Sequence, residues 1–321
     1  MSELSDLEKR VLDVVQQDIP LVNRPFRNMS DKAGTDEESF LQCVQSLFDR
    51  DLIRDISAIY NARGLGYQST LVAVSTASPD KTANAISRYP GVSHNYYREH
   101  HFNVWFTLTI PEERDLDEVI RQILKDENYD SFRILPSIKT YKIGVNFRFS
   151  GEKKKKTINN YSSRIDSVDI NRDLIRKMQT PFPLVPEPWS EIADALGKSE
   201  EELFREIDIL KKAKVIKRIS GVIRHRKTGF GANGMACFQL SEDNIDSAGE
   251  KAARYSAVSH CYRRPVFPDW PYSLFAMTHG AAEEECENTA AEIATEIDAE
   301  KTLVLYSTKE YKKERVKYFL E

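Results

Sequence analysis

The sequence is poor in cysteine and contains no long apolar run. Its 321 residues include four cysteines. None of them has the C-x-x-C spacing, so the sequence indicates neither a disulfide framework nor a structural zinc site. The N-terminus reads MSELSDLEKRVLDVV, which has acids among the bases and lacks the apolar stretch of a signal peptide or a bilayer span. We therefore expect free thiols at Cys43, Cys237, Cys261 and Cys286, and a cytoplasmic protein.

An excess of positive charge is also missing. The formal net charge is −4 and the sequence pI is about 6.0. Proteins that grip phosphate backbones usually carry a strong basic field, so the charge argues against a nucleic-acid partner, although a local basic patch is still compatible with it. With 40% hydrophobic and 30% charged residues, the composition is that of a globular protein. The length suggests two or three domains.

What the sequence does contain is an internal repeat. The segment 20–57 aligns without a gap on 183–220, and both copies end in I-x-x-I-S. Further matches keep the same order: G-[YF] at 66 and 229, V-S-H-x-Y-x-R at 92 and 258, and S-x-K-x-Y-K at 137 and 307. Each half is therefore one structural unit on the usual domain scale of about 150 residues.

A polar segment separates the two copies. Residues 151–169 have no hydrophobic period and include a lysine run at 153–156, which is typical of a solvated surface linker. The predicted organisation is a winged helix-turn-helix at 1–62, an α/β domain at 63–150, the linker at 151–169, a second winged helix-turn-helix at 170–225 and a second α/β domain at 226–321.

The start of each copy shows helical periodicity. Apolar residues recur at helical spacing in 6–17 and from 170 onward, and a short helix is expected at about 188–196. Ser199 and Glu202 form an S-x-x-E capping box that begins the next helix, and Thr35 and Glu38 are expected to do the same in the first copy. Strand-like stretches follow, so each copy begins with a winged helix-turn-helix.

The rest of each copy alternates between strand and helix. In the first copy we expect strands at 69–76, 92–98, 102–110 and 132–146, with helices at 79–89 and 115–126. This β-α-β-β-α-β order predicts a ferredoxin-like unit, a four-stranded antiparallel sheet with two helices on one face. The fold class is therefore α+β, and the combination resembles the Lrp/AsnC regulator architecture.

The helix that would read DNA begins with acids. They are Asp36, Glu37 and Glu38 in the first copy and Glu200, Glu201 and Glu202 in the second. The first turn of a recognition helix enters the major groove, so acids there repel a polyanion and leave no base-reading arginine. Capping and compensation of the helix dipole explain the acids without DNA.

The V-S-H-x-Y-x-R motif carries the chemistry. Alternate residues of a strand lie on one face, so a histidine, a tyrosine and an arginine form a row with neighbours about 6–7 Å apart. Such residues make a poor core but a good lining for an anionic ligand. The rows are His94, Tyr96 and Arg98 in the first copy and His260, Tyr262 and Arg264 in the second.

More histidines and aromatics follow each row. Except for His225, every histidine lies in or just after the two strands. We expect no zinc site, because no Cys/His/carboxylate set has the usual spacing. An axial histidine to a heme-type iron stays open, and so does the choice between core packing and ring stacking for Trp105 and Trp270. The neighbours are His100, His101, Asn103 and Trp105 in the first copy and Arg263, Trp270, Tyr272 and His279 in the second.

At these residues the chain resembles siroheme decarboxylase. The phrases GVSHNYYREHHFNVWFTL, AVSHCYRRPVFPDWPYSLFAMTHG and LYSTKEYKK are similar to the signatures of the two subunits of that family, here fused head to tail. The resemblance implies removal of carboxylate from two acetate side chains of siroheme, giving 12,18-didecarboxysiroheme on the route to heme or heme d1. It implies no separate cofactor, because the iron belongs to the tetrapyrrole substrate.

If the chain has that activity, the residues of the two rows and their neighbours are expected to bind the substrate or to supply protons. Arg98, Arg263 and Arg264 would bind substrate carboxylates, with Trp105, Trp270 and Tyr272 beside the macrocycle. The expected acids are His100, His101, His260 and His94, with Tyr96 and Tyr262 orienting or sharing the proton. The halves form an intramolecular pseudo-heterodimer, and pairing of two chains is left open. The alternatives are an Lrp/AsnC-type regulator that senses a small molecule or heme, and a non-catalytic tetrapyrrole carrier.

Overall fold

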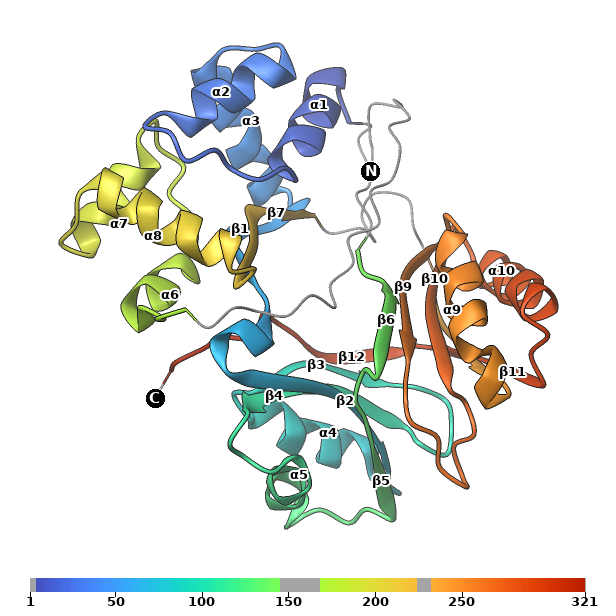
Figure 1. The fold of residues 1–321 in the computed structure, drawn as a ribbon. Helices are drawn as coiled ribbons and strands as arrows, with labels where there is room; N and C mark the ends of the chain where they lie inside the picture. Colours follow the sequence, from blue (N-terminus) through green and yellow to red (C-terminus); the bar gives the residue numbers. More distant parts are fainter. Residues whose placement is uncertain (1–3, 145–167, 224–231, 321) are drawn as a thin grey trace.

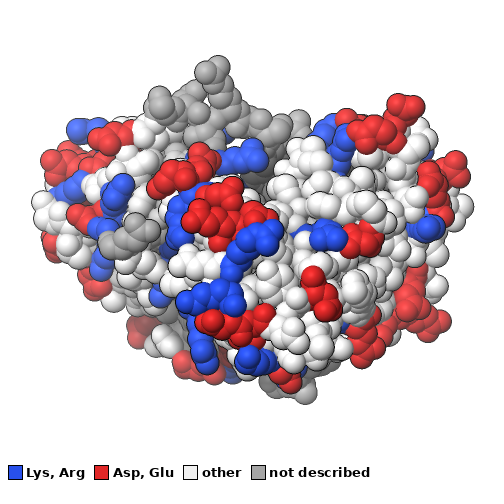
Figure 2. Space-filling model, turned by 90° about the horizontal axis from the view of Figure 1, so that it is seen from below, with Lys and Arg blue, Asp and Glu red and all other residues white. Residues whose placement is uncertain are grey.

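The computed structural model describes residues 4–144, 168–223 and 232–320. A pair of helical units lies above two five-stranded antiparallel sheets (Figure 1). On the face shown in Figure 2, lysine and arginine side chains are interspersed with aspartate and glutamate. Within the described ranges, no helix combines the length and the apolar character needed to cross a membrane. His225 and most of the predicted linker at 151–169 lie outside the described residues.

The first winged helix-turn-helix comprises α1 (Asp6–Val15), α2 (Pro25–Ala33), α3 (Glu37–Asp49) and the strand β1 (Ile53–Tyr60). Proline at the first position of α2 fixes the backbone for helix entry. The predicted cap at Thr35 is wrong by one residue. Asp36 is the N-cap of α3, and its carboxylate accepts a hydrogen bond from the Ser39 N–H at 2.8 Å.

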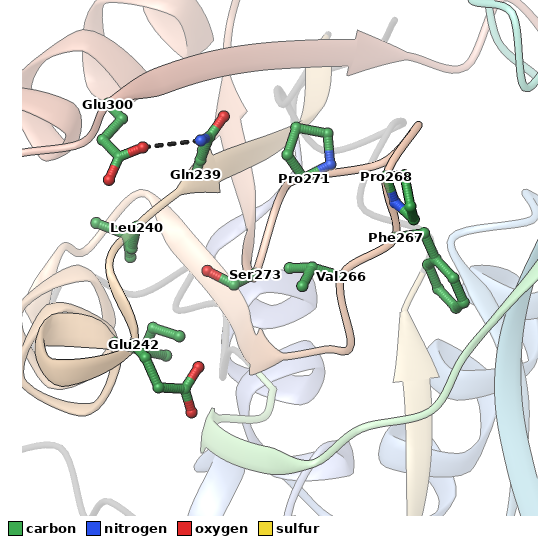
Figure 3. Close-up of a pocket in the computed structure, with 10 residues that line it drawn as sticks. Gln239, Leu240, Glu242, Val266, Phe267, Pro268, Pro271, Ser273 and Glu300 are labelled. Carbon is green, nitrogen blue, oxygen red and sulfur yellow. Dashed lines mark hydrogen bonds between the residues drawn. The ribbon is translucent and has the colours of Figure 1, made fainter.

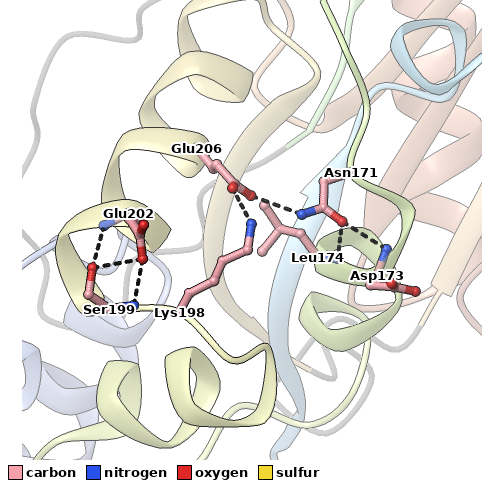
Figure 4. Close-up of polar contacts among 7 residues, drawn as sticks. All are labelled: Asn171, Asp173, Leu174, Lys198, Ser199, Glu202 and Glu206. Carbon is pink, nitrogen blue, oxygen red and sulfur yellow. Dashed lines mark hydrogen bonds and ion pairs between the residues drawn. The ribbon is translucent and has the colours of Figure 1, made fainter.

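The second copy contains α6 (Arg172–Met178), α7 (Pro188–Ala195), α8 (Glu200–Lys212) and β7 (Ile216–Ile223). The predicted capping box at the start of α8 is confirmed. The Ser199 hydroxyl accepts from the Glu202 N–H, and the Glu202 carboxylate accepts from the Ser199 N–H (Figure 4). Of the three acids at the start of α8, Glu202 therefore satisfies the backbone N–H of its own N-cap residue.

The two helical units share one core. Strands β1 and β7 pair antiparallel, and the repeated I-x-x-I-S phrases meet where Ser57 lies opposite Ser220. One continuous cluster of buried apolar side chains spans both units. The Trp189 indole N–H donates to the Pro20 carbonyl at 3.0 Å, which ties the second unit to the first.

The first sheet has the strand order β12-β3-β4-β2-β5. Its members from the first half are β2 (Tyr67–Ser75), β3 (Val92–Tyr97), β4 (Val104–Pro111) and β5 (Ser131–Leu135). Helices α4 (Pro79–Arg88) and α5 (Leu116–Leu124) cover one face. A short 3-10 helix, η1 (Ala62–Leu65), leads into this sheet from β1.

The second sheet repeats this plan in the order β11-β8-β10-β9-β6. Its own strands are β8 (Ala232–Gln239), β9 (Val258–Arg263), β10 (Leu274–Gly280) and β11 (Lys301–Tyr306). The 3-10 helix η3 (Glu242–Asn244) and helices α9 (Ile245–Arg254) and α10 (Glu283–Glu296) connect them. The predicted ferredoxin-like α+β unit is thus present in both halves.

The halves exchange their last strands. Strand β6 (Lys139–Lys142) belongs to the first half but pairs with β9, while β12 (Lys309–Lys313) at the end of the chain pairs with β3. The single strand predicted at 132–146 is therefore wrong. Pro136, which has no N–H to donate, falls between β5 and β6, and the chain crosses to the other sheet there.

The two sheets face each other across a second apolar core. The strands contribute Trp105 and Leu135 from the first half and Phe275 and Leu305 from the second, and the connections β3–β4 and β9–β10 add Phe102 and Trp270. Trp270 lies at the centre, with its ring centroid 5.2 Å from that of Trp105 and 6.0 Å from that of Phe102. Both indoles are 1% exposed. The two tryptophans are therefore core residues, which is the packing alternative that the sequence left open.

Candidate active site at two bulged strands

A β-bulge lies at the start of each V-S-H motif. In the first sheet Val92 lies opposite Leu108 and His94 opposite Thr107, so Ser93 has no partner on β4. Ser259 is the extra residue in the second sheet, between Val258 and His260. In both bulges the serine Oγ lies beside the Nδ1 of the next histidine, at 3.0 Å for His94 and 2.8 Å for His260. Bulges commonly re-aim side chains near active sites.

The predicted side-chain rows begin at these histidines. The ring centroids of His94 and Tyr96 are 6.1 Å apart, and those of His260 and Tyr262 are also 6.1 Å apart. All four side chains are partly exposed. Burial raises the pKa of Tyr262 to about 12, so its phenol stays protonated at neutral pH. The second row therefore offers an imidazole and a neutral phenol on the same strand face, and the first row places an imidazole and a phenol in the same way.

The arginines that end the rows bind the opposite half. Arg98 is 5% exposed, and its Nη1 donates to the Leu305 carbonyl at 2.6 Å. Arg264 makes the equivalent bond to the Leu135 carbonyl, and its guanidinium lies 5.0 Å from the Tyr262 ring centroid. Each Nε is buried and has no hydrogen-bond partner among the described residues. Both guanidinium groups thus join the two sheets in this structure.

Two basic side chains lie near His94. Burial lowers the pKa of His94 to about 4, and the nearby charges of Arg54 on β1 and Lys313 on β12 push it in the same direction. The imidazole is therefore neutral at pH 7. A bound anion would compensate these cations and raise the pKa of the ring again.

A further arginine extends this positive region. Arg315 follows β12, and its Nη1 lies 3.2 Å from an Asp55 carboxylate oxygen and donates to the Ser57 hydroxyl. Burial lowers the pKa of Arg315, while the Asp55 charge raises it and those of Arg54 and Arg218 lower it. The basic side chains Arg54, Arg218, Lys313 and Arg315 thus lie near the β1–β7 pair and the end of β12, together with the acids Asp55 and Glu310. The sequence alone does not predict this group, because its members come from distant segments of the chain.

The hairpins that follow the rows contact each other. The His100 ring lies 5.4 Å from the Trp270 ring, and its Nδ1 accepts from the Phe102 N–H at 3.0 Å. Burial lowers the pKa of His100, and the charge of His101 adds to the effect. His101 is exposed. These two histidines thus lie at the junction of the halves and outside the two bulges.

The remaining predicted residues are placed as follows. Arg263 pairs with the Glu242 carboxylate, and Tyr272 lies half-buried with its ring 5.0 Å from that of Trp270. The Asn103 side chain donates to the Thr76 carbonyl at 2.8 Å. None of these contacts involves a row histidine, so the structure groups these residues with the hairpins.

Figure 3 shows a pocket of about 540 Å³ near the second hairpin. Val266, Phe267 and Pro268 line one side, and Glu242 and Glu300 supply its carboxylates. Neither row lines it, and its acids make it a poor site for a polycarboxylate. Across the described parts of the chain, no three His, Cys, Asp or Glu side chains gather into a metal site.

Fold and site together define a fused pair of Lrp/AsnC-type units with a histidine and a tyrosine at each of two equivalent bulges. A family model for an AsnC-like ligand-binding domain matches residues 64–142 and 227–312. A model for the siroheme decarboxylase NirDL-like HTH domain matches residues 8–54 and 171–217.

The similar full-length proteins agree with these models. Siroheme decarboxylase of Hydrogenobacter thermophilus is 37% identical over 316 residues, which cover 97% of this chain and 95% of the relative. The NirDL subunit of siroheme decarboxylase from Paracoccus denitrificans is 29% identical over 95% of both chains. The solved structure of siroheme decarboxylase NirDL superposes with a TM-score of 0.76 at 34% identity, over 98% of this chain and 94% of that one. The chain belongs to the siroheme decarboxylase family.

Proposed function

We propose that the chain removes carboxylate from two acetate side chains of siroheme, giving 12,18-didecarboxysiroheme on the route to heme d1. Two matched Ser–His–Tyr rows, in a chain of this family, are the observation that carries the proposal. A NirDL structure with a TM-score of 0.76 and 33% identity holds an iron-uroporphyrin III analogue, also a polycarboxylate tetrapyrrole. That structure covers 98% of this chain.

The reaction needs little beyond a binding site and a proton. When the bond between the acetate methylene and its carboxylate breaks, the electron pair passes into the conjugated macrocycle, which serves as the electron sink. Carbon dioxide leaves, and the methylene carbon takes up one proton to become a methyl group. We propose that no separate cofactor is used, because the iron and the conjugated ring both belong to the substrate.

The rows are suited to supply that proton. In the proposal, a bound carboxylate compensates the charges of Arg54 and Lys313, raises the pKa of His94 from about 4 and lets the ring carry a proton. His260 is the equivalent proton donor in the second copy, and Tyr96 and Tyr262 orient or share the proton. Ligation of the substrate iron by one row histidine is the other role we assign to these rings.

Binding of the remaining carboxylates falls to cations. The sequence assigned this role to Arg98, Arg263 and Arg264, but Arg98 and Arg264 bond the opposite half and Arg263 pairs with Glu242. Beside these three we propose Arg54 and Arg315 as further carboxylate ligands, although Arg315, like Arg263, already has a carboxylate partner, Asp55. His100 and His101 stay candidate proton donors at the hairpin rim.

The assembly and setting follow from the same proposal. The two halves act as an intramolecular pseudo-heterodimer in the cytoplasm, with the domain boundaries expected from the sequence except for the exchanged strands β6 and β12, and pairing of two chains stays open. We propose no nucleic-acid partner, because acids begin α3 and α8. The regulator alternative predicts duplex binding that weakens steeply with salt, so the absence of a shift at low salt with ligand present would remove it.

Mass spectrometry of the tetrapyrrole tests the proposed activity. Purified protein is incubated with siroheme without oxygen, and we expect loss of two carbon dioxide molecules. An unchanged mass together with a shifted Soret band would indicate a carrier or sensor and would refute the enzyme. Arg315→Gln, compared with Arg315→Lys, should raise KM mainly in the glutamine variant, because only lysine keeps the charge.

A further inference from the structure

A line of hydrogen bonds extends behind His260 into the second sheet. The His260 Nδ1 lies 2.8 Å from the Ser259 Oγ, which lies 2.5 Å from the His279 Nε2. The His279 Nδ1 in turn lies 2.5 Å from the Asn233 Oδ1. The bulge at Ser259 makes this possible, because it brings an extra side chain between β9 and the end of β10.

The first copy has no histidine at the matching place. Met277 lies opposite His260 and Thr107 opposite His94, so His279 corresponds to Thr109, two residues further along the strand. Thr109 instead bonds the Ser69 hydroxyl at 2.9 Å. The two copies thus share the serine and the first histidine but differ in what stands behind them.

The direction of each bond follows from its acceptors. The Asn233 Oδ1 can only accept, so the His279 Nδ1 donates to it. Burial lowers the pKa of His279, which keeps the ring neutral and makes its Nε2 an acceptor for the Ser259 hydroxyl. The Ser259 oxygen then accepts from the His260 Nδ1–H. The line therefore fixes the neutral His260 ring with its proton on Nδ1.

We propose that His279 is a positioning residue that acts through Ser259 to fix the orientation and tautomer of His260, so that the His260 Nε2 delivers the proton in decarboxylation. This inference rests on the proposed function. As the methylene–carboxylate bond breaks and carbon dioxide leaves, the proton moves from Nε2 of protonated His260 to the methylene carbon. His260 is left neutral with its proton on Nδ1, the tautomer that the line stabilises, and solvent returns the proton before the second acetate reacts.

Two substitutions of His279 separate positioning from packing. Glutamine carries an amide oxygen near the place of Nε2 and can still accept from Ser259, whereas leucine fills the space without an acceptor. We expect His279→Leu to lower kcat about 10-fold or more, in the range of outer-shell partners and proton donors, with KM little changed. His279→Gln should keep most of the rate. Equal losses in both variants, or an unchanged rate in the leucine variant, would overturn the inference.

Substitutions of Ser259 and of the matching residue in the first copy test whether His279 acts through the hydrogen bonds to Ser259 and His260. Ser259→Ala should lower kcat as His279→Leu does, and the double variant should be little worse than either, because both break one path. Thr109→Val removes a hydroxyl at the matching place in the first copy and should leave kcat unchanged. Additive losses from Ser259→Ala and His279→Leu would contradict a shared path.

Nitrogen-15 NMR of the histidine rings supplies a readout that packing alone would not change. In the wild-type chain the neutral His260 ring should show its proton on Nδ1, and this preference should disappear in His279→Leu but persist in His279→Gln. A proton on Nε2 of the neutral wild-type ring would refute the tautomer assignment. If wild-type protein leaves the mass of siroheme unchanged, the proposed function fails, while the NMR result still decides whether the line fixes the tautomer.

Discussion

Replacing Arg98 with methionine separates an interface role from a substrate-binding role. Burial of the guanidinium lowers the pKa of Arg98 from 12.5 to about 10, which corresponds to about 3 kcal/mol of unfavourable free energy for keeping the charge. Methionine removes this cost and retains an unbranched stem. It also gives up the bond to the Leu305 carbonyl, worth about 1.5–3 kcal/mol because the donor is charged. The two effects nearly cancel, so we expect Arg98→Met to stay within about 1 kcal/mol of the wild type.

Alanine at the same position should behave differently. It removes the charge but also leaves a cavity between the sheets, which typically costs about 2–5 kcal/mol for a long side chain. Urea unfolding followed by tryptophan fluorescence reports on the contact directly, because Trp105 and Trp270 lie in the same core. Equal destabilisation by methionine and alanine would refute the reasoning. Activity gives the second readout: a stable Arg98→Met protein that no longer decarboxylates siroheme would restore the carboxylate-binding role predicted from the sequence.

Three further predictions concern the junction of the halves and the first row. Trp270→Ala should lower the free energy of unfolding by about 3–5 kcal/mol, because the ring is fully buried, whereas truncating exposed Val266 should have little effect; thermal melts compare the two. The Arg133–Asp269 ion pair joins the halves but is partly exposed, so Asp269→Asn should cost about 1 kcal/mol or less, and a larger loss that persists in high salt would contradict this. The pKa of His94 is about 4 in the folded protein, compared with 6.5 for an unperturbed histidine. The unfolded chain therefore binds a proton at this ring more readily than the folded protein does. The contribution of the neutral His94 ring to the free energy of unfolding is complete above about pH 6.5 and is lost as the pH falls toward 4. In His94→Gln, the urea midpoint should therefore change less between these two pH values than it does in the wild type.

The repeat made most of the fold predictable. Local signals placed the helices well, because capping residues and apolar periods act within a few residues of sequence, as at Ser199 and Glu202. The sequence did not show that the segment 132–146 forms two strands, β5 and β6. β5 and β6 have similar strand propensity, and only the presence of the second sheet decides that β6 joins β9.

The site was predictable in part. Alternation along a strand placed His94 with Tyr96 and His260 with Tyr262, because that period is a property of the backbone alone. The burial of Arg98 could not be foreseen, since its partner Leu305 comes from the other half. Ser259 and His279 belong to a sequence motif that was noted from the sequence. The bulge that brings them together depends on the pairing register of β9 and β10, which the sequence does not give.

The strand exchange also sets the order in which the chain can mature during synthesis. The first sheet closes its edge with β12, whose residues 309–313 are synthesised long after those of β3. The first half therefore waits with the outer edge of β3 unpaired while the second half is translated. Edges of this kind pair readily with other chains, so a nascent chain stalled before residue 309 should be more prone to aggregation than the finished protein.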